Sequence, residues 1–136
     1  MIVFGIELKG SEAVIVIVEY ENSLFTVKKY QKVPINSINQ SDARSFRDIF
    51  ISLIDEYSPI KLFINSRQQK GGYAGGAMTF IMEGILLTIE SVEIVSIFSQ
   101  TLSAEIKSGK IQEGCKQSPK YTNKAYQLAL SGALEC

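Results

Sequence analysis

A short apolar run near the N-terminus constrains the fold of this chain more than any other feature. Residues 13–18 read AVIVIV and are rich in β-branched side chains. A run this short, apolar at every position, is typical of a strand that is covered on both faces. Turn signals flank it, Lys-Gly before and Glu-Asn-Ser after, and apolar segments lie beyond them at 2–8 and 24–33. We therefore expect a three-stranded antiparallel meander, with the lysine-rich third strand near a sheet edge.

The pattern changes after residue 40, where apolar residues recur at helical spacing. Phe46, Phe50 and Leu53 belong to a stripe that predicts a helix over 41–57, with Ser41 as its N-cap. Ser58-Pro59 ends this helix. The remaining segments alternate: strands are expected over 60–64 and 92–97, and helices over 77–90, over 99–107 and from residue 120 onward.

This order predicts a single α/β domain over residues 1–136, because the sequence shows neither an internal repeat nor a linker. Three meander strands are followed by two strands that are reached through helices. With right-handed crossovers, this connectivity predicts a mixed five-stranded sheet with helices on both faces. The expected strand order is 3-2-1-4-5, with the first strand in the centre.

Composition excludes several kinds of chemistry. The chain has no histidine, which removes every histidine-based nucleophilic, acid–base and metal site. Its two cysteines, Cys115 and Cys136, form no CxxC pair, so a zinc or iron–sulfur site is not expected, and their role stays open. Fourteen basic and fourteen acidic residues give zero net charge, hence no strong overall field toward nucleic acid. Without a signal-peptide pattern or an apolar run of membrane-spanning length, we expect a cytoplasmic protein and no membrane contact.

Two segments carry a resemblance to known families. The element order is that of the ribonuclease-H-like fold, and the opening VFGIELKG resembles the first strand of RuvC-type Holliday-junction resolvases, which usually reads hydrophobic-Gly-Ile-Asp-Pro-Gly. The stretch FINSRQQKGGYAGGAMTFIMEG resembles a bacterial family of ribonuclease-H-like domains of unknown function. The Lys-Gly-x-x-Ala-Gly-Gly-Ala motif of that family stands here at residues 70–77.

The resemblance implies a specific place for a nuclease site. Such nucleases hold two divalent ions between carboxylates of separate elements. Glu7 stands at the first position, but Asn65 stands at the second, and the last helix begins with Lys120-Tyr121-Thr122-Asn123-Lys124, without an acid. We therefore expect no metal, no cofactor and no cleavage. The alternatives are a divergent magnesium-dependent resolvase with Glu7 as a catalytic ligand, or a Glu7 that serves only structure, paired for instance with Arg67.

The glycine-rich stretch is the second candidate site. It lies between a strand and a helix N-terminus, where free amides favour anions. The candidate contacts to an anion or a nucleic-acid backbone are Arg67, Lys70, Gly71, Gly72, Gly75 and Gly76, with Lys107 and Lys110 alongside. The alternative is that the glycines permit a tight turn and that the lysines are merely solvated.

The helix over 77–90 carries two apolar stripes, so it is either deeply buried or partly covered by another subunit. One stripe suggests a homodimer contact through Met78, Met82, Leu86 and Ile89. The two leading hypotheses for function are thus a module that binds nucleic acid weakly and a protein-interaction module.

Overall fold

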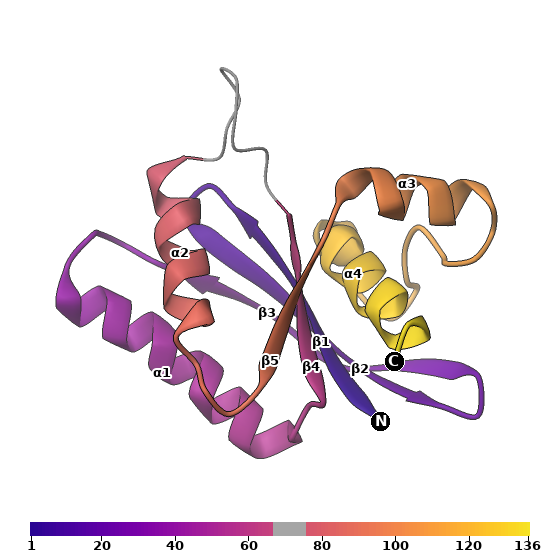
Figure 1. Ribbon diagram of the computed structural model, residues 1–136, viewed down its shortest axis with the longest axis horizontal. Coiled ribbons are helices and arrows are strands. Elements are labelled where there is room, and N and C mark those ends of the chain that lie inside the picture. The colour runs from indigo at the N-terminus through magenta and orange to yellow at the C-terminus, as the bar shows by residue number, and fades with distance from the viewer. Residues whose placement is uncertain (67–75) are drawn as a thin grey trace.

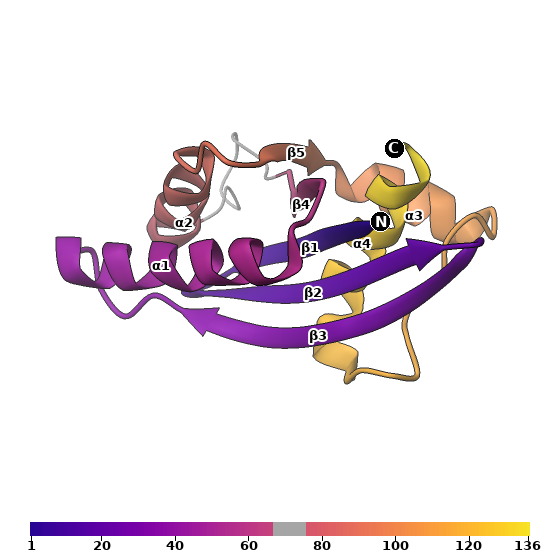
Figure 2. The same ribbon diagram turned by 90° about the horizontal axis from the view of Figure 1, so that it is seen from below.

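The computed structural model describes residues 1–66 and 76–136. Its centre is one five-stranded sheet in the order β3-β2-β1-β4-β5, as Figure 2 shows. β2 pairs antiparallel with both β1 and β3, whereas β4 pairs parallel with β1 and with β5. The expected mixed sheet and strand order are confirmed. The strands are β1 (Ile2–Lys9), β2 (Glu12–Glu21), β3 (Leu24–Pro34), β4 (Lys61–Asn65) and β5 (Glu93–Ile97).

Helices cover both faces of the sheet, as expected (Figure 1). α1 (Gln40–Tyr57) and α2 (Ala77–Leu87) pack on one face. α3 (Ser99–Lys107), the short 3₁₀ helix η1 (Lys120–Thr122) and α4 (Asn123–Leu134) lie on the other. None of the helices in the two described segments is long and apolar enough to span a bilayer.

The first helix begins earlier than the sequence suggested. Asn39, not Ser41, is its N-cap: Asn39 has an extended backbone, and its side chain accepts a hydrogen bond of 2.8 Å from the amide of Asp42. Both residue types cap helices well, so the sequence alone does not rank them. The helix ends as expected at Ser58, which adopts a left-handed conformation with φ of 49°.

The prediction for the surface of α2 is wrong. Met82 and Leu86 are fully buried and Ile89 is 5% exposed, while Met78 packs against the same core. This stripe therefore faces the molecule's own sheet and is not an exposed contact for a second copy. Phe80 and Leu87 are the large apolar side chains that α2 exposes, by 42% and 61%. Self-association stays a prediction, and a contact between two copies would have to use a surface other than this stripe.

Candidate nucleic-acid interface

Glu7 lies on the sheet face that α4 covers, near the C-terminal end of β1. Alternate residues of a strand point to opposite faces, so Glu7 shares this face with Val3 and Gly5. Its side chain is only 18% exposed, and Lys9 Nζ lies 3.9 Å from its Oε1. Burial raises the pKa of the Glu7 carboxyl, although Lys9 and Lys124 act to lower it. Glu7 is thus a half-buried acid near two lysines and near the carboxylate of Glu12, which acts to raise its pKa further.

Asn65 has a structural task. The parallel ladder between β1 and β4 ends at the pair Ile6 and Ile64, one residue before Asn65. Asn65 Oδ1 accepts a hydrogen bond of 2.8 Å from the amide of Leu8, and its Nδ2 donates one of 3.3 Å to the carbonyl of Leu8. The side-chain amide therefore continues the ladder by one step. A carboxylate could accept the first bond but could not donate the second.

The start of α4 brings lysine and amide groups toward Glu7. A hollow of about 440 Å³ opens there. It is lined by Glu7, Lys9, Ser103, Ile106, Glu113, Lys120, Tyr121, Asn123, Lys124 and Gln127. Three of these side chains are basic and two are acidic, so the hollow carries a small positive excess. A phosphate oxygen entering it meets ammonium and amide donors, which suit an anion.

The donor set does not fit two divalent metal ions. Within residues 1–66 and 76–136, no three histidine, cysteine, aspartate or glutamate side chains come together as metal ligands would. The nine residues between these segments read RQQKGGYAG, which includes none of those four types. Magnesium takes oxygen ligands, usually carboxylates together with substrate phosphates. The hollow offers two carboxylates, Glu7 and Glu113, together with the competing positive charges of Lys9, Lys120 and Lys124.

An aromatic and basic cluster that the sequence analysis missed borders this hollow. Lys32 Nζ lies 4.3 Å from the centroid of the Tyr121 ring, which is within range of a cation–π contact. Tyr30 meets the same ring edge to face, with centroids 6.4 Å apart and planes at 75°. We call Tyr30, Lys32 and Tyr121 the tyrosine–lysine cluster. The signal for it lay in the strand register: Glu7 pairs with Val14, and Val14 pairs with Lys32.

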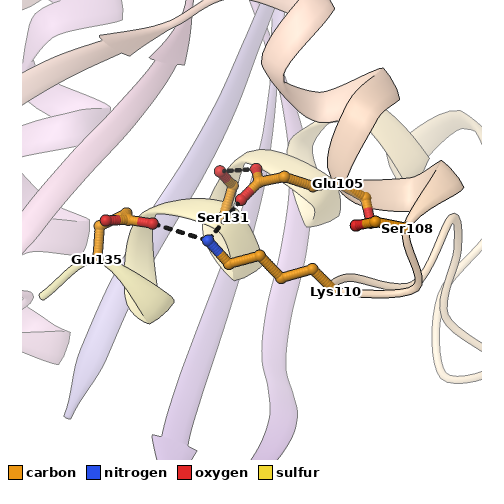
Figure 3. A network of polar contacts seen from close by, with 5 residues as sticks. All are labelled: Glu105, Ser108, Lys110, Ser131 and Glu135. Atoms are coloured by element: carbon orange, nitrogen blue, oxygen red, sulfur yellow. Dashed lines mark hydrogen bonds and ion pairs between the residues drawn. The ribbon is translucent and has the colours of Figure 1, made fainter.

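Lys110 is committed to carboxylates, as Figure 3 shows. Its Nζ lies 3.0 Å from Glu105 Oε2 and 2.8 Å from Glu135 Oε1, and the Ser131 hydroxyl donates to the other oxygen of Glu105. Glu135 and Glu105 raise the pKa of Lys110, and Lys110 lowers the pKa of Glu135. This network joins the end of α3 to the end of α4. We therefore leave Lys110 out of the candidate interface.

The other expected contacts lie in different places. Lys107 is exposed in the last turn of α3. Gly76 is the N-cap of α2, with an ordinary φ of −65°, and no atom of the described residues lies within 4 Å of where a Cβ would stand, so nothing in that part of the chain requires glycine there. The expected contacts Arg67, Lys70, Gly71, Gly72 and Gly75 lie outside the described residues.

Both cysteines are free thiols, Cys115 half-buried and Cys136 exposed. The backbone amide of Gln117 donates to the sulfur of Cys115 at 3.3 Å. In turn, Gln117 Oε1 accepts a hydrogen bond of 3.1 Å from the amide of Val27 on the edge strand β3. Cys115 thus belongs to a loop that covers a sheet edge.

Solved structures with the same fold include several Holliday-junction resolvases. RuvC of Thermus thermophilus in complex with a Holliday junction substrate superposes with a TM-score of 0.77 at 13% identity, over 98% of this chain and 93% of that one. A second structure of Thermus thermophilus RuvC gives 0.72 at 12% identity, with the same coverage. The yeast mitochondrial Holliday junction resolvase gives 0.56 at 12% identity, over 96% and 74% of the two chains.

At these identities the likeness establishes the fold, which is the expected RuvC-type, ribonuclease-H-like one. A search among curated protein sequences finds no significant match. Residues 1–132 match the family model described as "Protein of unknown function (DUF3010)", and the chain belongs to that family.

Proposed function

We propose that this chain is a nucleic-acid-binding domain of RuvC-like fold that does not cleave phosphodiesters. One observation carries the proposal: in the hollow, three lysines face only two carboxylates, Glu7 and Glu113, and the side chain of Asn65 is hydrogen-bonded to the backbone of Leu8. Two-metal cleavage requires several carboxylates around the scissile phosphate. Phosphate binding requires only positive charge and hydrogen-bond donors.

The lysines supply directly the positive charge that metal ions would otherwise bring. Lys9, Lys120 and Lys124 line the hollow next to Glu7. An ammonium group binds phosphate as a point charge and generates no nucleophilic hydroxide. Because the whole chain has zero net charge, this attraction is local, and we expect affinity that is modest and strongly dependent on salt. A cytoplasmic site of action belongs to the same proposal, since nucleic acid is the ligand.

The alternative is a magnesium-dependent nuclease of the RuvC resolvase type, with Glu7 as its catalytic ligand. The fold favours this alternative, because several structures with the same fold are resolvases and two of them hold a junction. The chemistry of the site weighs against it, because the other expected carboxylate positions hold Asn65 and the lysine-rich start of α4. A protein-interaction module without nucleic-acid binding is the remaining hypothesis.

Fluorescence anisotropy with single-stranded, duplex and four-way-junction DNA at several salt concentrations tests binding. Each lysine–phosphate contact contributes about 0.7 to 0.9 to the slope of log affinity against log salt. Lys124→Ala should therefore weaken binding and reduce the slope by about that amount. Lys61→Ala is the matched control, since Lys61 starts β4 at the far end from Asn65 and pairs with Glu93 at 3.4 Å. It removes the same charge and should leave the slope unchanged.

The same substrates incubated with magnesium or manganese test cleavage, and we expect no product. Cleavage that disappears in Glu7→Gln would overturn the non-cleaving part of the proposal and establish the resolvase alternative. A protein that binds none of the three DNA forms at high micromolar concentration and low salt would refute the proposal as a whole. The protein-interaction hypothesis would then stand.

A further inference from the structure

The tyrosine–lysine cluster places a flat aromatic surface at the edge of the sheet. Tyr30 belongs to the edge strand β3, and its side chain is 41% exposed. Tyr121 belongs to η1, which lies over β2, and is half-buried. The contact with Tyr121 supports the Tyr30 ring, and a large part of Tyr30 stays open to solvent. A half-exposed, laterally supported ring of this kind is a stacking platform for another flat group.

The cluster and the Glu7 hollow form one continuous surface. Lys32 pairs with Val14, which pairs with Glu7, so the three side chains share one face of the sheet. Tyr121 joins the two parts, because its ring contacts Lys32 and Tyr30 and also lines the hollow beside Lys120. Positive charge therefore runs alongside an aromatic ring over η1 and the edge of the sheet.

An exposed aromatic ring beside lysines favours single-stranded over duplex nucleic acid. In a duplex, both faces of each base are stacked on neighbouring pairs, and an external ring cannot reach them. In a single strand, a base can turn out and stack on an aromatic side chain while lysines follow the phosphates. Stacking of this kind strengthens binding about five- to one-hundred-fold per base and tolerates any sequence.

We infer that this surface binds single-stranded nucleic acid, with an unpaired base on Tyr30 and phosphates along Lys32, Lys120 and Lys124. The inference rests on the proposed nucleic-acid binding and names its substrate class. It assigns specificity to the tyrosine and affinity to the lysines. The two contributions predict different responses to salt, because stacking releases no counterions.

A single-stranded oligonucleotide that carries 2-aminopurine as a stacking reporter tests the inference. The wild-type protein should quench the reporter and bind this strand more tightly than the matching duplex. Tyr30→Leu keeps apolar bulk against Tyr121 but removes the flat ring. It should abolish the quenching and weaken single-strand binding about five- to one-hundred-fold, with the salt slope unchanged. Tyr30→Phe should retain the quenching and the single-strand affinity. Lys32→Ala should lower the slope of log affinity against log salt by about 0.7.

Leu24→Ala is the control on the same strand, because Leu24 is 70% exposed and apolar. It should bind like the wild type, and thermal unfolding should show that all variants are folded. Binding that is equal for duplex and single strand and insensitive to Tyr30→Leu would overturn the inference while leaving the proposed function intact. The absence of any DNA binding would refute both together.

Discussion

The two faces of the sheet are packed in opposite ways. α4 crosses β1 so closely that a Cβ on Gly5 would lie 1.8 Å from the carbonyl oxygen of Ala125 and 2.7 Å from the nitrogen of Ala129. Farther along α4, a Cβ on Gly132 would enter the ring of Phe63. On this face, the backbone of the helix rests on the backbone of the strand.

The opposite face is packed by long side chains. Phe4 and Ile6 of β1 meet Phe46, Phe50 and other large residues there, all nearly or fully buried. α1 and α2 stand apart enough to leave a groove of about 470 Å³. Gly84 lines this groove, and within the described part of the chain no atom comes within 4 Å of where its Cβ would be.

The difference explains why the candidate interface lies where it does. Backbone-to-backbone contact leaves α4 little freedom to shift, so the start of α4 holds Lys124 at a fixed place relative to Glu7 on β1. Sites supported by such rigid elements keep their geometry better than sites on loops or loosely packed helices. The α1–α2 face contributes stability through burial and can tolerate changes in side-chain shape.

Of the variants that test this comparison, Gly5→Ala should change the free energy of unfolding the most. The added methyl group meets backbone atoms, which cannot turn aside as a side chain can. We expect a loss of more than about 3 kcal/mol in the free energy of unfolding, beyond the usual cost of overpacking. Gly132→Ala, whose methyl meets the Phe63 side chain, should cost less. Urea unfolding measures both. A Gly5→Ala protein within about 1 kcal/mol of the wild type would contradict the close seating of α4.

Asn65→Asp should cause the next largest loss of stability. It removes the side-chain N–H that donates to the Leu8 carbonyl and places a carboxylate next to that carbonyl oxygen. A buried polar group that loses its partner costs about 1–3 kcal/mol. The matched control is Asn22→Asp in the exposed β2–β3 turn, where φ is 53° and aspartate is tolerated. Equal unfolding midpoints for the two variants would show that the hydrogen bonds between Asn65 and the Leu8 backbone add nothing to stability.

The sheet was predictable because its signals are local. The all-apolar run of β2, the turns around it and the helical stripe of α1 each require only neighbouring residues, and together they determine strand order. The orientation of α2 was not predictable, because both of its stripes are apolar. Only packing decides that Met82 and Leu86 face the core while Phe80 faces out.

The candidate site was predictable only in part. The positions of Glu7 and Asn65 at strand ends follow from the strand pattern. The hydrogen bonding of Asn65 to Leu8 depends on where the β1–β4 ladder ends, which the pattern does not give. Lys32 and Tyr121 are far apart in sequence, and nothing local to either residue indicates that they meet. Lys110 looked free as a loop lysine, whereas the fold places two carboxylates beside it.

Gly84→Ala should change the free energy of unfolding by less than Gly5→Ala does, and it should stabilise the protein where Gly5→Ala destabilises it. Gly84 lies within α2, and no atom of residues 1–66 or 76–136 is within 4 Å of the place of a Cβ. Alanine limits the unfolded chain and favours the helix, so the free energy of unfolding should rise by about 0.5–1 kcal/mol. Differential scanning calorimetry would register this as a higher Tm. A lower Tm would mean that α1 and α2 approach each other as closely as α4 approaches β1.

Glu7→Gln should have the smallest effect, and its size should depend on pH. Burial raises the pKa of Glu7 in the folded protein, so the folded state holds the proton more tightly than the unfolded chain does. The stability from the protonated form is present at acidic pH, below the unfolded pKa, and is lost as pH rises through the folded pKa. Glutamine stays neutral throughout, so the variant should have a higher Tm than the wild type at pH 7 and an equal one at low pH. Glu90→Gln, at an exposed position, removes the same charge and is the control. A variant that is less stable than the wild type at pH 7 would mean that the attraction of Lys9 and Lys124 outweighs the cost of burying the carboxylate. Glu7 would then stabilise the α4 face instead of straining it.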